Sequence, residues 1–193
     1  VATHPEDWAI VAPSEEKARI IMDYIIDRIF DDKLFADQLE YHSSKEKLKQ
    51  ERNKTRITFR DGGEVRVYSG NAANTRQVKN ALMGFGAPNV ILDEAGQIGD
   101  ELYATVKRML GGSKDNFLLE IGNPVYRNHF HRTWFGDRYM KIYRNDEMAL
   151  AEGRYTKDFL DEMRDEAGYD WLYQCVFPDA SEVLPSGYRR LVS

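Results

Sequence analysis

The chain has 193 residues, 42% of them hydrophobic, and a formal net charge of −5 at pH 7. This length and apolar content suffice for one sizeable core, so the fold needs no disulfide or metal to hold it. The single cysteine, Cys175, excludes an internal disulfide and favours a reducing compartment. No run of apolar residues is long enough to cross a bilayer, and no basic region precedes an apolar one at the start, so we expect neither a membrane span nor a secretory signal.

The first elements predicted are a strand and a helix. Residues 8–12 form a short apolar run that predicts a strand. Ser14 is a good N-cap for a helix whose first turn begins with two acidic residues. An apolar stripe at helical spacing follows, consisting of Ala18, Ile21, Tyr24, Ile25 and Ile29. This stripe indicates a helix that packs on the core.

A hairpin and a short helix come next. Residues 57–60 and 65–70 alternate between apolar and polar side chains on either side of Asp61-Gly62-Gly63. This pattern predicts two paired strands joined by a tight turn. Residues 74–82 then predict a short helix.

Two adjacent carboxylates follow the next apolar run. Residues 89–92 predict a buried strand, and Asp93 and Glu94 come directly after it. If the strand stays regular, these two side chains point to opposite faces. One carboxylate can then face a metal ion and the other an attacking water, although a strand that simply meets solvent would also carry acids.

A second strand strengthens the case for chemistry. Residues 97–110 have apolar side chains at helical spacing and end at Gly111-Gly112, and residues 116–121 predict another buried strand, closed by Gly122, Asn123 and Pro124. Strand, helix and strand form a right-handed parallel crossover. Ligands bind at the carboxyl ends of such strands, so we expect Asp93, Glu94 and Asn123 to gather there. Residues 138–144 predict one further strand.

The order of these motifs resembles the ATPase domain of the large terminase subunit of tailed bacteriophages. Residues 90–95 are similar to its Walker B motif, and residues 121–135 to its coupling motif and the helix after it. The resemblance extends to residues 8–19, 57–70 and 175–179, and so covers nearly the whole chain. It implies an α/β fold with a predominantly parallel central sheet flanked by helices, the P-loop NTPase core of RecA/ASCE type. It also implies an ATPase domain over residues 1–180 and an exit segment over residues 181–193.

The resemblance assigns roles to individual residues. Asp93 would hold Mg²⁺ through its water shell, and Glu94 would orient and deprotonate the attacking water of ATP hydrolysis. Asn123 would sense the γ-phosphate, and Gly122 would lie beside the nucleotide. Members of the family often carry an arginine about ten residues before the carboxylates, where this chain has Met83. Arg76 is then the nearest candidate for the nucleotide-binding arginine.

The chain also departs from the family. It contains no Gly-x-x-x-x-Gly-Lys-Ser/Thr sequence, the loop that wraps phosphates. In the family this loop precedes the strand matched by residues 8–12, and a nuclease domain follows the ATPase domain. We therefore expect this chain to be a fragment of a longer protein, poorly active alone.

Charge is segregated along the chain. Residues 45–60 carry seven basic side chains against two acids, and residues 146–170 carry nine acids against three bases. The basic stretch fits the backbone of double-stranded DNA, but a solvated helix and loop explain it as well.

The family implies further partners: the portal protein, the small terminase subunit and other copies of the chain in a ring, in the host cytoplasm and away from any membrane. Two alternatives remain open. One is a helicase-like ATPase fragment, and the other is a non-catalytic DNA-binding or assembly module derived from such an ATPase.

Overall fold

A computed structural model of the chain describes residues 6–39, 55–70 and 75–179. The chain packs as two compact units, Val1–Ile121 and Gly122–Ser193. The division falls inside the single domain predicted over residues 1–180, and residues 181–193 lie outside the described part, so the predicted domain boundaries stay a prediction. None of the described helices is long and apolar enough to cross a membrane.

The first unit is built around a five-stranded sheet. Its strands are β1 (Trp8–Ala12), β2 (Arg56–Thr58), β3 (Glu64–Ser69), β4 (Asn89–Leu92) and β5 (Phe117–Glu120). Its helices are α1 (Glu15–Asp31), α2 (Lys33–Ala36), α4 (Thr75–Phe85) and α5 (Asp100–Leu110). The strands lie in the order β2-β3-β1-β4-β5, in which only the β2–β3 pair is antiparallel. The predicted α/β fold with a mostly parallel sheet is confirmed.

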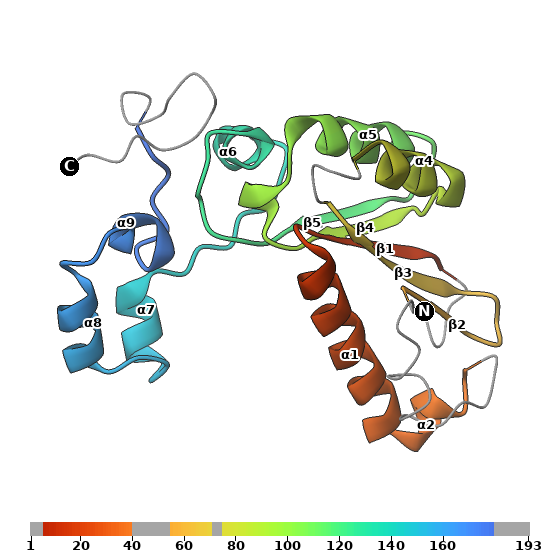
Figure 1. The fold of residues 1–193 in the computed structure, drawn as a ribbon, viewed down its shortest axis with the longest axis horizontal. Helices are drawn as coiled ribbons and strands as arrows, with labels where there is room; N and C mark the ends of the chain where they lie inside the picture. Colours follow the sequence, from red (N-terminus) through yellow and green to blue (C-terminus); the bar gives the residue numbers. More distant parts are fainter. Residues whose placement is uncertain (1–5, 40–54, 71–74, 180–193) are drawn as a thin grey trace. The chain divides into compact units, whose positions relative to one another are not determined.

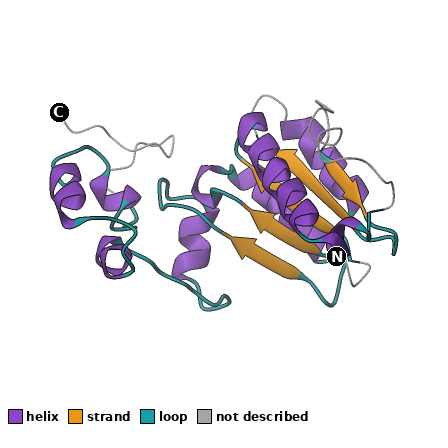
Figure 2. Cartoon of the chain, turned by 90° about the horizontal axis from the view of Figure 1, so that it is seen from below, coloured by secondary structure: helices purple, strands orange, loops and turns teal. Residues whose placement is uncertain are grey.

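Helices cover both faces of this sheet. Figures 1 and 2 show α1 along one face, with α4 and α5 on the other. On the α1 face, Ile10 and Ala12 of β1 pack with Ala18, Met22 and Ile26 of α1. The predicted N-cap is confirmed as well, because the Ser14 side chain accepts a hydrogen bond of 3.2 Å from the Lys17 backbone amide.

Three local predictions need correction. The helix expected from residue 97 begins at Asp100, because a 3₁₀ turn over Ala95–Gln97 precedes it. The strand expected to be buried, β5, is the edge strand of the described sheet, and its Phe117 and Leu119 are 44% and 36% exposed. Residues 138–144, predicted as a strand, contain no regular secondary structure.

The regular secondary structure described in the second unit is helical. Its helices are α6 (His129–Phe135), α7 (Asp146–Ala151), α8 (Lys157–Met163) and α9 (Tyr169–Leu172). The buried Tyr169 hydroxyl donates a hydrogen bond of 2.6 Å to Asp146, which joins the first residues of α7 and α9. A ring cluster of Phe130, His131, Phe135 and Phe177 packs α6 against the end of the described chain. Burial and the charges of Arg127 and Arg132 lower the pKa of His131.

Candidate functional site

The two carboxylates follow β4 at the carboxyl edge of the sheet. Because β1, β4 and β5 are parallel, their last residues meet at this edge. Backbone hydrogen bonds fix the chain where it leaves the sheet. The amide of Asp93 donates to Val11 of β1 at 2.9 Å, and the amide of Ala95 donates to Ile121, just after β5, at 2.7 Å. The turn that carries Asp93 and Glu94 is thus attached to both neighbouring strands.

Glu94 has an unusual backbone conformation. Its φ of 51° and ψ of 48° place it in the left-handed region, which residues with a Cβ rarely occupy. The regular strand ends at Leu92, so the predicted alternation of Asp93 and Glu94 between opposite faces does not apply. Strained residues of this kind persist where the surroundings fix them, and they gather at active sites.

A lysine from α1 reaches the second carboxylate. Lys17 Nζ lies 3.3 Å from Glu94 Oε1 and donates a hydrogen bond to it, across a separation of 77 residues. The side chains of Lys17 and Glu94 are 43% and 30% exposed. This contact follows from the topology, because β1 and β4 are parallel neighbours and α1 starts directly after β1.

Burial and charge act on Asp93 in opposite directions. Burial is the main cause that raises the pKa of Asp93, and the neighbouring Glu94 carboxylate raises it further. The charge of Lys17 and a backbone hydrogen bond lower it. One ammonium therefore faces two carboxylates, which leaves an excess negative charge that favours a bound cation.

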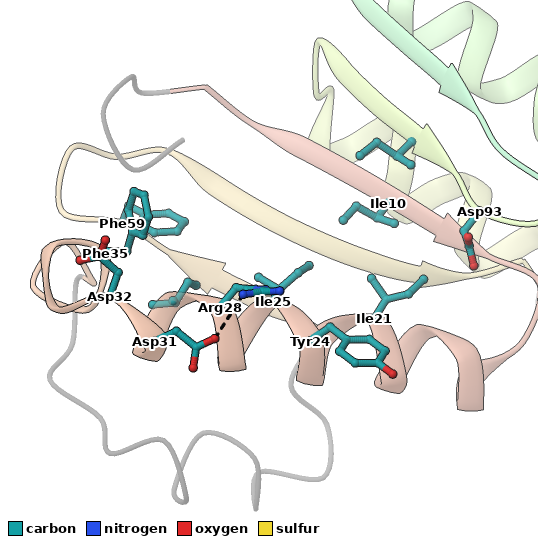
Figure 3. A pocket seen from close by; sticks show the side chains of 12 residues that line it. Ile10, Ile21, Tyr24, Ile25, Arg28, Asp31, Asp32, Phe35, Phe59 and Asp93 are labelled. Atoms are coloured by element: carbon teal, nitrogen blue, oxygen red, sulfur yellow. Dashed lines mark ion pairs between the residues drawn. The ribbon is translucent and has the colours of Figure 1, made fainter. Parts of the chain in front are cut away.

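Asp93 lies at one end of an apolar groove. The groove has a volume of about 630 Å³ and lies between α1 and the sheet. Its walls include Ile10, Ile21, Ile25 and Ile91. Figure 3 shows Asp93 at one end of the groove and Phe35 and Phe59 at the other. Apolar neighbours of this kind disfavour the charged form of Asp93.

The donor set fits one magnesium ion but no zinc site. Among the described residues, no group of three or more His, Cys, Asp or Glu side chains could hold a metal. Magnesium differs from zinc in that it commonly takes only one or two carboxylates and completes its shell with water and substrate phosphates. Asp93, with Glu94 beside it, meets this requirement.

Gly122, Asn123 and Arg76 are the other predicted site residues. Gly122 and Asn123 are the first two residues of the second unit, so their gathering with the carboxylates stays a prediction. Gly122 has a φ of 153°, and the Asn123 backbone carbonyl accepts a hydrogen bond of 2.9 Å from Val125. Arg76 is exposed in the first turn of α4 and, within the described part of the chain, is not a partner of Asp93 or Glu94.

Lys17 is the site residue that sequence reasoning missed. In the sequence it is an ordinary lysine in the first turn of an amphipathic helix. The signal that points to it is topological: a helix directly after a strand that neighbours β4 must bring its first turn to the carboxylates. Only the order of the strands supplies this information.

Comparison with solved structures identifies the fold. The chain is similar to the large terminase ATPase domain of Thermus phage P74-26, with 18% identity, a TM-score of 0.65, and coverage of 90% of this chain and 77% of that one. A point mutant of the same phage domain gives 17% identity, a TM-score of 0.66, and coverage of 92% and 79%. No family model and no curated protein sequence matches the chain. The chain therefore has the fold of a phage large terminase ATPase domain, which is a P-loop NTPase fold.

Proposed function

We propose that this chain is the ATP-hydrolysing domain of a viral DNA-packaging terminase, which couples Mg-ATP hydrolysis to the translocation of double-stranded DNA into a capsid. One observation carries the proposal: Asp93 and Glu94 follow the interior strand β4 at the carboxyl edge of a sheet with the terminase ATPase fold. Nucleotide hydrolases of this class need a metal-binding acid and a water-orienting acid at that edge.

The residues divide the chemistry between them. Bound Mg²⁺ would neutralise the charge that develops on the nucleotide phosphates. Asp93 would hold this ion, as the Walker B aspartate. Glu94 orients the attacking water and accepts its proton, and the hydrogen-bonded turn around Glu94 holds its backbone in place. Asn123 would contact the γ-phosphate, and Gly122 and Arg76 would lie beside the nucleotide.

The proposed partners follow from this function. Double-stranded DNA is the substrate that moves, and the portal protein and the small terminase subunit are the protein partners. Several copies act together as a ring in the host cytoplasm. The likeness of the fold to the Thermus phage ATPase domain supports this assignment.

Phosphate release tests the proposal. We expect the full-length protein to hydrolyse ATP only with Mg²⁺, and Glu94→Gln to lower turnover about 100- to 10,000-fold while nucleotide still binds, because the amide keeps the shape but accepts no proton. Glu16→Gln is the matched control, since Glu16 is exposed in the first turn of α1. Parental turnover in Glu94→Gln would exclude Glu94 as the base, and no turnover in the parent would favour a non-catalytic module.

A further inference from the structure

Within the described parts of the chain, one carboxylate oxygen of Glu94 is held by a hydrogen bond and the other has no donor. Its Oε1 accepts the hydrogen bond from Lys17, whereas none of the residues described by the structure donates to Oε2. A carboxylate held at one oxygen keeps the other available for a water molecule. The hydrogen bond also restricts the side-chain rotation that Glu94 would otherwise have at the sheet edge.

We propose that Lys17 is a positioning residue for Glu94, an inference that rests on the proposed ATPase function. The backbone turn fixes where the Cα of Glu94 lies, and Lys17 fixes where its carboxylate lies. Two independent elements thus determine the position of one side chain: β4 with its neighbours, and the first turn of α1. The Ser14 cap holds that first turn, because it accepts a hydrogen bond from the Lys17 amide.

The size of the effect follows from the exposure of the pair. A partly exposed ion pair changes an equilibrium by about 1.5- to 5-fold. A positioning role acts on the reaction step, because Lys17 donates its hydrogen bond to Glu94 and reaches Asp93 only through its charge. The expected signature is therefore a lower kcat with an unchanged KM for Mg-ATP.

Four variants of the full-length protein test this inference by steady-state kinetics. We expect Lys17→Met to lower kcat about 2- to 5-fold with KM unchanged, and Lys17→Arg to keep the parental kcat because it restores the donor and the charge. Arg19→Met is the matched control, since Arg19 lies two residues further along α1 and pairs with Glu15 at 3.2 Å. It removes the same charge from the same helix turn but no contact with Glu94, so we expect parental kinetics.

The fourth variant, Glu94→Gln, separates the two hypotheses. If Glu94→Gln abolishes turnover while Lys17→Met and Arg19→Met behave alike, the positioning role is wrong and the proposed function stands. A raised KM with unchanged kcat in Lys17→Met would make Lys17 a nucleotide ligand and would also overturn the inference. Parental turnover in Glu94→Gln would instead overturn the proposed function.

A double-mutant cycle provides a readout without nucleotide. Urea unfolding of the 193-residue chain is measured for the parent, Lys17→Met, Glu94→Ala and the double variant. We expect a coupling of about 1.5- to 5-fold in the unfolding constant at low salt, and less at high salt because ions screen the pair. A cycle in which Arg19→Met takes the place of Lys17→Met should give no coupling with Glu94→Ala. Equal coupling in the two cycles would contradict a direct Lys17–Glu94 interaction.

Discussion

The backbone amide of Ala95 donates a hydrogen bond of 2.7 Å to the carbonyl oxygen of Ile121. This bond joins the turn after β4 to the end of β5, and Ile121 is the last residue of the first unit. On the other side of Glu94, the Asp93 amide bonds to Val11. Glu94 is therefore held between two fixed amides, which explains why its left-handed conformation persists despite its cost.

This strain predicts an unusual order of stabilities at position 94. Glu94→Gly should be more stable than Glu94→Ala by about 1 kcal/mol, because glycine adopts a φ of 51° without the steric clash of a Cβ. Both variants lose the Lys17 contact, so the difference between their free energies of unfolding reports the cost of the backbone conformation alone. Urea unfolding measures these free energies. Ala104→Gly in α5 is the control and should lose about 1 kcal/mol, because helical backbone favours alanine. Equal stabilities of the two position-94 variants would argue against the strained turn.

Local patterns predicted the elements of the site well. The apolar run of β4, the Ser14 cap of α1 and the parallel crossover to β5 each depend on neighbours in sequence, and all three are confirmed. The left-handed Glu94 was not predictable in this way. Its conformation depends on the hydrogen bonds of the two neighbouring amides to Val11 in β1 and to Ile121 just after β5.

Burial was harder to predict than strand formation. The apolar residues of β5 are typical of a strand covered on both faces. In the described sheet β5 pairs with β4 alone, so Phe117 and Leu119 remain partly exposed. Residues 138–144 have the composition of a strand, but they form none in the structure. The prediction failed because a strand needs a partner strand, and composition does not reveal one.

The environment of Asp93 predicts that this residue lowers stability at neutral pH. Burial raises its pKa above the ordinary 3.8, so the folded state binds a proton more tightly than the unfolded state. The free energy of unfolding then falls as pH rises from 3.8 through the raised pKa, and stays lower above it. Asp93→Asn carries no charge, and we expect it to be more stable than the parent at pH 7 and to lose this advantage as pH falls.

Thermal unfolding at several pH values measures this difference, with Asp115→Asn as the control because Asp115 is exposed before β5. In the full-length protein the same Asp93→Asn change should weaken the dependence of nucleotide binding on Mg²⁺. A variant that is less stable at pH 7, or that keeps the parental magnesium dependence, would contradict the role given to Asp93.

We expect Gly122, at the boundary of the two units, to be sensitive to substitution. Its φ of 153° is a conformation that residues with a side chain rarely adopt. We expect Gly122→Ala to lower the free energy of unfolding by about 1–3 kcal/mol. Gly84→Ala is the control, since it lies within α4 and an added Cβ would meet nothing within 4 Å. That change should raise stability by about 0.5–1 kcal/mol. Similar effects of the two substitutions would mean that Gly122 has no special backbone requirement.

DNA binding, if residues 45–60 provide it, should be electrostatic and independent of sequence. Most of this stretch lies outside the described residues. Of its described members, Arg56 pairs with Glu64 at 2.5 Å and the Arg60 side chain donates to the Leu39 carbonyl at 3.1 Å, so these two stabilise the fold. The residues to replace are therefore Lys47 and Lys49.

Each lost phosphate contact reduces the log-log salt slope of DNA affinity by about 0.9, so Lys47→Gln with Lys49→Gln should flatten the slope by about 1.8 for any duplex. Arg19→Gln with Arg28→Gln removes the same charge from α1 and should leave the slope unchanged. Equal slopes in all three proteins would mean that residues 45–60 are only a solvated surface. The DNA contacts would then be sought at Arg138 and Lys141. Two nearby arginines already have partners: Arg127 donates a hydrogen bond of 3.0 Å to the Pro178 carbonyl, and Arg144 forms an ion pair of 3.3 Å with Glu152.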